Sequence, residues 1–316
     1  MRIRSIAALS AAALSVLLLA GCTGANPDAD PSSPDDAPAG DLCASAVPAG
    51  SNSDAVVVEG EPGEAATATF EAPLEISSAE RTVIEEGDGP QLEDGDLVNY
   101  ALTIYDAATG DQASVEGYDS PLLPISVAVG SGADQFFGCV PVGSRIVMAL
   151  PETQASSAAI WVLDVLDTTQ TAAWGEEQEP AAGFPTVELE EDGAPTVTLP
   201  EGDMPTEFKK TTLKKGDGAV VEQGDAVLVQ YHGVSWDTGE VFDESWGGQP
   251  FSFSTSGGVV QGFADAVLGE TVGSQVIAVL PPAVAYGEGE INDEDLTGQT
   301  LVFVIDILAV QTPPAE

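Results

Sequence analysis

Segment 241–253, VFDESWGGQPFSF, gathers three phenylalanines and one tryptophan around a single aspartate, Asp243, which follows the first phenylalanine. Aromatic rings with one carboxylate among them could bind an apolar group in a dry site and polarise one bond of it. Phenylalanines that alternate along a strand are usually core residues, however, and an aspartate at a strand end usually caps a turn. The segment alone leaves both interpretations open, ordinary core or the lining of a site.

The composition limits the chemistry that the rest of the chain can add. The only histidine is His232, and no Cys/His cluster occurs, which argues against a metal site. Eight Lys and Arg residues stand against 52 Asp and Glu residues, giving a formal net charge of −44. This charge argues against nucleic-acid binding and against electrostatic attachment to an anionic membrane, and it would keep an exported chain in solution.

The N-terminus has the pattern of an export signal over residues 1–21. Two arginines precede an apolar run that is shorter than the roughly 20 residues a spanning helix needs. The end of this run, Leu-Ala-Gly-Cys, resembles the lipobox of bacterial lipoproteins, which implies a lipid on Cys22 and a location outside the cytoplasm, on the outer face of the cell membrane. The alternative is a plain secretory signal. Residues 22–40 are rich in Pro, Asp, Ala and Ser, and we expect a disordered tether.

Two cysteines remain after Cys22, namely Cys43 and Cys139. Thiol pairs tend to oxidise outside the cytoplasm, so a disulfide between them is the favoured interpretation, and two unpaired buried thiols are the alternative. The disulfide would fix the end of the tether to the body of the protein.

The chain contains an internal repeat that suggests its domain organisation. The segment that begins VIEEGDG at Val83 parallels the segment that begins TLKKGDG at Thr212, and the offset of 129 persists without a gap to Gly110 and Gly239. The later copy has 12 additional residues before its last apolar run. We therefore expect domains at 41–170 and 196–316, joined by a linker at 171–195 that is rich in Pro and Glu.

Both copies have the composition of β-sheets. Runs such as AVLVQYHG and LVFVIDIL are rich in β-branched and aromatic residues and are bounded by turn residues. Only residues 259–269 show helical periodicity, with Phe263 and Val267 on one face. The expected fold class is α+β, with two domains that each consist of an antiparallel sheet wrapped around one short helix.

The second copy resembles the FKBP-type peptidyl-prolyl cis–trans isomerases over residues 206–310. The motifs that carry the resemblance occur in the family's order: KKGDGAVVEQGDAVLVQYHG, VFDES, QPFSF, VVQGFADAVLGETVGSQ, LPPAVAYGEG and TLVFVIDIL. The first copy resembles the same domain more faintly. The resemblance implies two FKBP-like domains, of which the first is degenerate.

The resemblance also assigns a pocket residue by residue. The residues at the family's catalytic positions are Tyr231, Phe242, Asp243 and Tyr286. Those at its substrate-binding positions are Phe251, Val259, Val260, Phe263 and Phe303. Two features depart from the family: Phe263 replaces a tryptophan, and the loop after Tyr286 is acidic and lacks proline. An acidic loop should favour neutral or basic residues around the substrate proline.

The implied reaction is rotation about an X–Pro amide, whose barrier of about 18–20 kcal/mol arises from amide resonance. No bond breaks in this rotation, so no cofactor is expected. The implied partners are proline-containing polypeptides and macrolide inhibitors, and the implied role is the folding of exported proteins. Two alternatives use the same scaffold: a non-catalytic chaperone or proline-binding lipoprotein, and a purely structural lipoprotein of the cell surface.

The first copy lacks the residues that would form this pocket. At the offset of 129, Tyr231 is replaced by Leu102, Phe242 by Ala113 and Asp243 by Ser114. In the last apolar run, where the offset is 142, Trp161 takes the position of Phe303. The shorter connection also removes the loop that carries Tyr286. We therefore expect the first copy to be inactive and to act as a spacer, a client-binding surface or a dimer contact.

Overall fold

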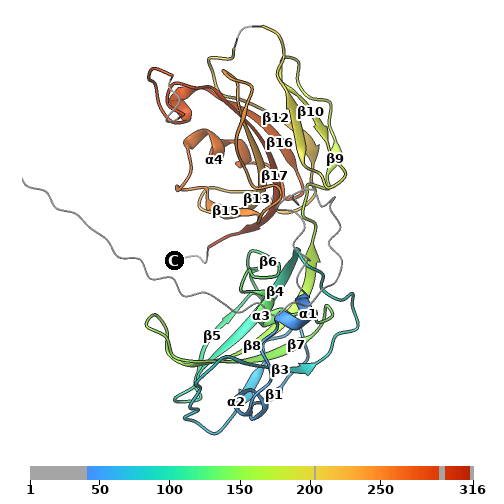
Figure 1. Cartoon of the computed structure of the whole chain (residues 1–316), viewed down its shortest axis with the longest axis vertical. Coiled ribbons are helices and arrows are strands. Elements are labelled where there is room, and N and C mark those ends of the chain that lie inside the picture. The colour runs from blue at the N-terminus through green and yellow to red at the C-terminus, as the bar shows by residue number, and fades with distance from the viewer. Residues whose placement is uncertain (1–40, 203, 292–295, 314–316) are drawn as a thin grey trace, which may run out of the picture. The chain divides into compact units, whose positions relative to one another are not determined.

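The computed structural model describes residues 41–202, 204–291 and 296–313, and it consists mainly of antiparallel strands with a few short helices (Figure 1). Up to residue 169 the elements are α1 (Leu42–Ser45), α2 (Ser51–Asp54), β1 (Val57–Glu59), β2 (Thr67–Thr69), β3 (Glu80–Glu85), β4 (Asp96–Asp106), β5 (Gln112–Glu116), β6 (Ile125–Val127), α3 (Asp134–Phe137), β7 (Arg145–Leu150) and β8 (Ala159–Thr169). The later elements are β9 (Glu176–Glu177), β10 (Thr186–Leu189), β11 (Pro195–Thr198), β12 (Lys209–Lys215), β13 (Ala226–Ser235), β14 (Val241–Glu244), β15 (Phe251–Ser254), α4 (Gln261–Val267), β16 (Gln275–Leu280), the 3-10 turn η1 (Pro282–Val284) and β17 (Leu301–Gln311).

The strands form two main sheets with the same strand order. In the second sheet the order is β14-β13-β17-β16-β12-β9, and β15 pairs with the other end of β13. In the first sheet the order is β5-β4-β8-β7-β3, and β6 pairs with β4 in the same way. Only β9 has no counterpart in the first sheet among the described residues.

Three irregularities of pairing also recur in both sheets. Each ladder β3–β7, β4–β8 and β4–β5 shifts register once, and the shifts lie between residues 83 and 85, 99 and 100, and 104 and 105. The corresponding ladders of the second sheet shift between residues 212 and 214, 228 and 229, and 233 and 234. Every shift is displaced by the offset of the sequence repeat, so the two copies share the bends of their strands as well as their order.

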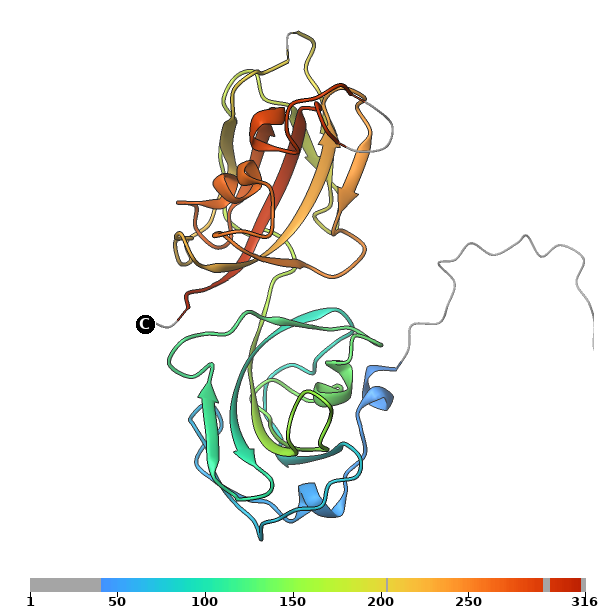
Figure 2. The same cartoon turned by 90° about the vertical axis from the view of Figure 1, so that its left-hand side faces the viewer.

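Each side of the second sheet has its own apolar cluster. Helix α4 lies on one side of this sheet (Figures 1 and 2). There its Phe263, Ala266 and Val267 form a core with alternate residues of β16 and β17. On the other side Val187 and Val197 of the β10–β11 hairpin pack on the remaining residues of the same strands. Because both sides are covered, these strands are almost continuously apolar instead of alternating.

The first sheet is covered in the same manner. The β1–β2 hairpin packs on one side, where Val58 and Ala68 meet residues of β7 and β8. The pairing of Val57 with Thr69 in this hairpin corresponds to the pairing of Thr186 with Thr198 in the other, again at an offset of 129. The structural repeat therefore begins before the point at which it was recognised in the sequence.

The β10–β11 hairpin changes the expected domain boundaries around segment 171–195. The segment was predicted to be a linker, but it contains β9, which pairs with β12, and β10, which pairs with β11. A boundary at residue 196 would cut β11 and separate it from β10. The segment is rich in Pro and Glu, a composition that is typical of linkers. Its hairpin has too few apolar residues to show a clear strand pattern.

The helices are shorter than predicted. The expected helix at 259–269 is observed as α4, which ends before Gly269, a residue with φ 78° that the left-handed turn after a helix favours. Lys210 donates to the carbonyls of Ala266 and Leu268 at this end, at 3.1 and 2.8 Å. At the matching position Arg81 donates to the carbonyls of Phe136 and Phe137 of α3. The expected fold class has one short helix in each domain, and α3 is the helix of the first copy that matches α4. Its position and the four-residue helices α1 and α2 were not predicted, because one turn has no measurable periodicity.

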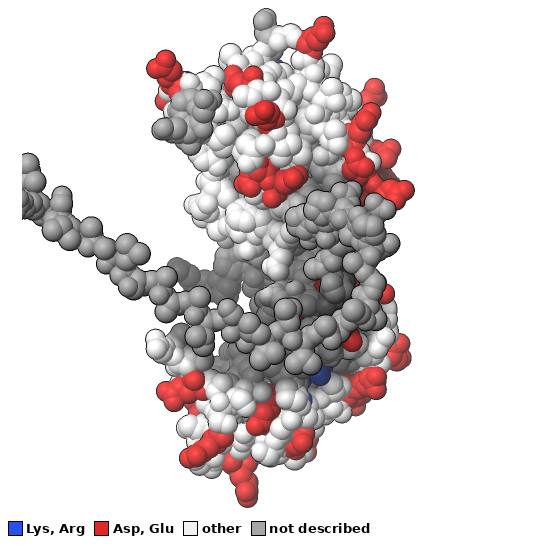
Figure 3. Space-filling model, in the orientation of Figure 1, with Lys and Arg blue, Asp and Glu red and all other residues white. Residues whose placement is uncertain are grey.

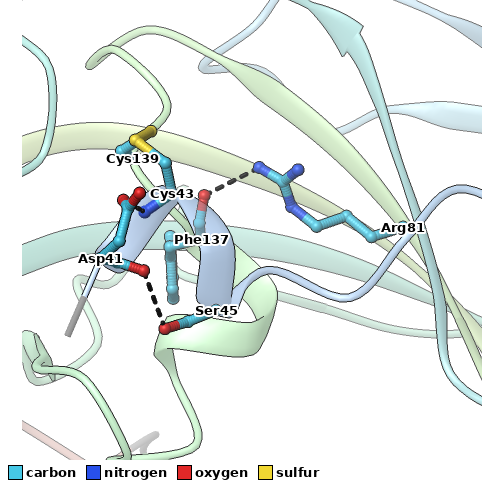
Figure 4. The surroundings of a disulfide bond; sticks show 6 residues. All are labelled: Asp41, Cys43, Ser45, Arg81, Phe137 and Cys139. Atoms are coloured by element: carbon cyan, nitrogen blue, oxygen red, sulfur yellow. Dashed lines mark hydrogen bonds between the residues drawn. A yellow bond between two sulfur atoms is a disulfide. The ribbon is translucent and has the colours of Figure 1, made fainter. Parts of the chain in front are cut away.

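A disulfide joins Cys43 of α1 to Cys139, with Cα atoms 4.7 Å apart (Figure 4). Asp41 caps the start of α1 by accepting from the backbone N–H of Cys43 at 3.0 Å. Leu42, which precedes the cysteine, is buried in the core that also contains Phe137. The start of the described chain is thus fixed to the first sheet by one covalent bond and one buried side chain.

The predicted signal peptide, Cys22 and the predicted tether lie outside the described residues. In the described part of the chain no helix is both long and apolar enough to cross a membrane. Acidic side chains are spread over the face shown in Figure 3, and basic side chains are scarce on it. All four lysines of the chain lie on β12, at positions 209, 210, 214 and 215.

Candidate functional site

A cavity of about 200 Å³ opens on the side of the second sheet that faces α4. Every residue predicted for the pocket except Phe242 lines this cavity, and so does Gly258, which was not predicted. Its lining consists of Tyr231, Asp243, Phe251, Gly258, Val259, Val260, Phe263, Tyr286 and Phe303. The volume lies below the roughly 300–1,000 Å³ of pockets for drug-sized ligands, so the cavity suits a group of about one ring.

Several elements bring these residues together. Tyr231 and Phe303 lie on the long central strands β13 and β17, and Tyr231 is paired with Ile305 across them. Asp243 comes from β14 and Phe251 from β15, two short strands that pair with opposite ends of β13. Since β13 and β17 are the most extensively paired strands, the centre of the site is built on the most rigid part of the sheet.

Phe263, in the first turn of α4, forms the floor of the cavity and is only 4% exposed. Its ring centroid lies 5.0 Å from that of Phe303, 5.1 Å from Phe253 and 5.6 Å from Tyr231, and the rings meet edge to face. Such pairs contribute about 0.5–1.5 kcal/mol each beyond the burial of their area. The smaller ring in place of a tryptophan is therefore held by its neighbours on three sides.

Phe242 supports the wall of the cavity from behind. Its ring meets that of Phe303 edge to face, with centroids 5.4 Å apart. The ring also lies against Gly233, where an added Cβ would come within 2.7 Å of it and within 3.0 Å of Phe303. Gly233 is thus required for the close packing of the two phenylalanines, a need that the sequence did not reveal.

Tyr231 and Asp243 form the polar part of the site. The hydroxyl of Tyr231 donates to a carboxylate oxygen of Asp243 at 2.7 Å. Burial, together with this hydrogen bond and the carboxylate charge, raises the pKa of Tyr231 far above its usual value of about 10. The tyrosine therefore remains protonated at neutral pH and keeps Asp243 oriented as an acceptor at the mouth of an apolar cavity.

The mouth of the cavity carries groups that can meet a polypeptide backbone. Val260 precedes α4 in an extended conformation, and within the described residues its N–H has no backbone or side-chain acceptor. Tyr286 follows the turn η1 and is 51% exposed. One backbone N–H without an acceptor in the described residues and one exposed tyrosine thus lie among the residues that line the cavity.

A family model described as FKBP-type peptidyl-prolyl cis-trans isomerase matches residues 218–308. An FK506-binding protein of Streptomyces anulatus is 38% identical over 119 residues, which are 37% of this chain and 96% of that protein. The chain belongs to the FKBP-type peptidyl-prolyl cis–trans isomerase family. The resemblance that was recognised from the sequence motifs is thereby confirmed for the second copy.

Further proteins are similar to this FKBP-type chain. A probable FK506-binding protein of Corynebacterium glutamicum is 37% identical over 116 residues, which are 36% of this chain and 97% of that protein. Among solved structures, FkpA from Escherichia coli is similar with a TM-score of 0.32 and 27% identity; the match covers 42% of this chain and 54% of FkpA.

The first sheet places different residues at the positions of the FKBP pocket. Leu102 replaces Tyr231 on β4, and Ala113 and Ser114 lie on the exposed strand β5. Trp161, at the position of Phe303, packs edge to face on Phe136 with centroids 6.0 Å apart. The connection between β7 and β8 covers only residues 151–158, whereas the one that carries Tyr286 covers 281–300.

Proposed function

We propose that this isomerase catalyses rotation about X–Pro bonds of exported polypeptides in the cavity between α4 and the second sheet. The observation that carries the proposal is the combination of an aromatic floor, the N–H of Val260 and the oriented pair of Tyr231 and Asp243 in one cavity of prolyl size.

The reaction requires stabilisation of a twisted amide. Resonance gives the X–Pro bond a barrier of about 18–20 kcal/mol, and twisting removes the resonance and makes the carbonyl less polar. Water favours the planar, polar amide, so transfer into a dry aromatic cavity favours the twisted form by comparison. Lowering the barrier by about 5–6 kcal/mol would accelerate rotation by roughly 10⁴-fold.

Each part of the cavity has a role in this proposal. Phe251, Phe263 and Phe303 hold the proline ring, with Phe242 behind the wall and Val259 at its side. The N–H of Val260 and the hydroxyl of Tyr286 bind substrate carbonyls, as the family resemblance implies. Asp243, oriented by Tyr231, provides the one charged group that can polarise the rotating amide.

A protease-coupled isomerisation assay on the chain that begins at Thr23 tests this function. We expect acceleration of an Ala–Pro peptide that a macrolide such as rapamycin abolishes, because the macrolide would occupy the same cavity. Binding of the macrolide without any acceleration would instead favour the non-catalytic, proline-binding alternative. The absence of both acceleration and macrolide binding would reject the proposed site itself.

We also propose that the first sheet belongs to an inactive domain and that the active domain begins near residue 171. This start includes Ala173, whose N–H donates to buried Asp306 at 2.7 Å, and the β10–β11 hairpin that covers the sheet. A chain of residues 41–170 should show no isomerase activity. Measurable activity of that segment would overturn the assignment of the first domain.

The sequence of the N-terminus supports a proposal for the location of the enzyme. We propose that residues 1–21 are removed and that Cys22 carries a lipid that holds the protein on the outer face of the cell membrane. Cys22→Ser should move the protein from the membrane fraction to the soluble exported fraction. An unchanged distribution in this variant would contradict lipid attachment and favour another mode of export.

A further inference from the structure

The end of strand β14 is fixed by a side chain. β14 is the edge strand of the second sheet and is only four residues long, and the next residue, Ser245, is 8% exposed. A short edge strand has a partner on one side only, so its end tends to open first. Asp243 is the last residue but one of this strand and lies two residues before Ser245, so its position is sensitive to the contacts that hold Ser245.

Ser245 is held by hydrogen bonds to two consecutive residues of β13. Its backbone N–H donates to the carbonyl of Tyr231 at 3.0 Å, and its hydroxyl accepts from the N–H of Tyr231 at 2.9 Å. The same hydroxyl donates to the side-chain oxygen of Gln230 in a short hydrogen bond. Gln230 is 5% exposed, so this contact is shielded from water. The serine thus closes the ladder beside the tyrosine whose hydroxyl orients Asp243.

The first sheet shows that the fold does not need this arrangement. At the offset of 129, Ser245 corresponds to Glu116 and Gln230 to Ala101. There β5 continues through Glu116, which pairs with Leu102 as an ordinary ladder residue, and the register shift lies at the same place as in the second sheet. The serine and the glutamine therefore occur together in the copy that has the cavity and are both missing from the copy in which the pocket residues are replaced.

We propose that Ser245 and Gln230 are positioning residues for the pair of Tyr231 and Asp243. Resting on the proposed function, this inference adds a second layer to the site: Gln230 orients the serine hydroxyl, the hydroxyl fixes the backbone of Tyr231, and β14 is thereby held so that Asp243 meets the tyrosine. The backbone turn from Ser245 to Gly248, closed by a 3.1 Å hydrogen bond, then leads the chain away toward Phe251.

The test compares Ser245→Ala, Ser245→Thr and Gln230→Ala in the chain that begins at Thr23. We expect Ser245→Ala to lower kcat/KM by about two- to tenfold, the effect of one hydrogen bond, mainly through kcat. Ser245→Thr keeps a hydroxyl and should restore the rate. Gln230→Ala should have the same effect as Ser245→Ala, and the double variant should lose no more than either single variant.

A spectroscopic readout separates positioning from mere stability. The ¹³Cζ chemical shift of Tyr231 reports whether its hydroxyl still donates to Asp243, and Ser245→Ala should move it toward the value found in Asp243→Asn. Glu116→Ala, the matched change in the first sheet, should alter neither the shift nor the rate. Because the shift is measured without substrate, it tests positioning even if the protein proves to have no isomerase activity.

The proposal fails if Ser245→Ala lowers only the unfolding temperature and leaves the Tyr231 shift and kcat/KM of the folded protein unchanged. It also fails if Ser245→Thr does not recover the Tyr231 shift, because the hydroxyl would then not be the group that matters. Should Ser245→Ala not fold, Gln230→Ala carries the same test.

Discussion

Each main sheet has a buried aspartate at the same position of matching strands, β8 and β17, but the two carboxyl groups have different kinds of hydrogen-bond donors. In the first sheet Asp164 forms a buried ion pair with Arg145 at 2.6 Å and also accepts from the hydroxyl of Tyr118 at 3.0 Å. In the second sheet Asp306 accepts from the neutral side chain of Gln275 and from the N–H of Ala173, both at 2.7 Å. The same buried carboxylate is thus paired with a cation in one copy and with neutral donors in the other.

The difference shows which parts of the repeat are interchangeable. Strand order, register shifts and covering hairpins are the same in both copies, although most side chains differ. Residues that line the cavity of the second copy are replaced at the matching positions of the first: Tyr231 by Leu102, Asp243 by Ser114 and Phe303 by Trp161. The same backbone can therefore carry different side chains at these positions, as expected when function depends on a few side chains.

The largest expected effect comes from replacing Arg145, the cationic partner of Asp164, by the residue type that pairs with Asp306 in the second sheet, a glutamine. Arg145→Gln would leave Asp164 buried without a cation and would also remove three hydrogen bonds to backbone carbonyls of residues 60–64. We expect the free energy of unfolding of this sheet to fall by about 3–5 kcal/mol, measured by urea denaturation with hydrogen exchange. Lys215→Gln, which breaks a more exposed ion pair with Glu270, should cost less than about 1 kcal/mol. Equal losses would show that burial is not what distinguishes Arg145.

The second-largest effect is expected when two pocket residues of the second sheet are replaced by those of the first. Phe242→Ala with Asp243→Ser installs the residues of the first copy, and kcat/KM should fall by roughly 100-fold, equivalent to about 2.7 kcal/mol of transition-state stabilisation. The reciprocal change in the first sheet, Ala113→Phe with Ser114→Asp, is the matched control and should create no activity. Retention of most of the activity in the first double variant would mean that these residues serve packing.

A third test sharpens the contrast between the two aspartates. Burial raises the pKa of Asp306 above its value in the unfolded chain, so between the two pKa values the folded state binds more protons at this group than the unfolded state. The stability that this group contributes is complete below about pH 4 and declines as pH rises through the folded-state pKa, by at most about 1.4 kcal/mol per pH unit.

Asp306→Asn removes this titration. The free energy of unfolding of the wild type minus that of the variant should therefore decrease from pH 4 to pH 8, as measured by urea titrations at several pH values. A difference that stays constant across this range would show that Asp306 does not take up a proton on folding.

The smallest expected effect concerns the difference in charge between the two edges of the second sheet. All lysines lie on β12, which β16, β17 and β13 separate from β14 at the pocket side, where Asp243 and Glu244 are exposed. Peptides with Lys beside the X–Pro bond should react about two- to fivefold faster than peptides with Glu, and added salt should reduce the difference. Equal rates at low salt would show that charge does not determine substrate preference.

The cavity could be predicted from the sequence because its residues lie on long strands with clear motifs. Tyr231, Phe251 and Phe303 were placed by resemblance, and the paired strands leave little freedom in where they point. Ser245 and Gly233 escaped notice because their importance lies in contacts with a neighbouring strand that no local pattern encodes. The β10–β11 hairpin was missed since its few apolar residues are meaningful only against the sheet they cover.

The two covering hairpins belong to the repeated unit of the chain. They lie at the same displacement as the strands and pair in the same register. The family match, by contrast, extends only over residues 218–308. The repeated unit therefore consists of the sheet together with its covering hairpin, and in the second copy it begins before the segment that the family model matches.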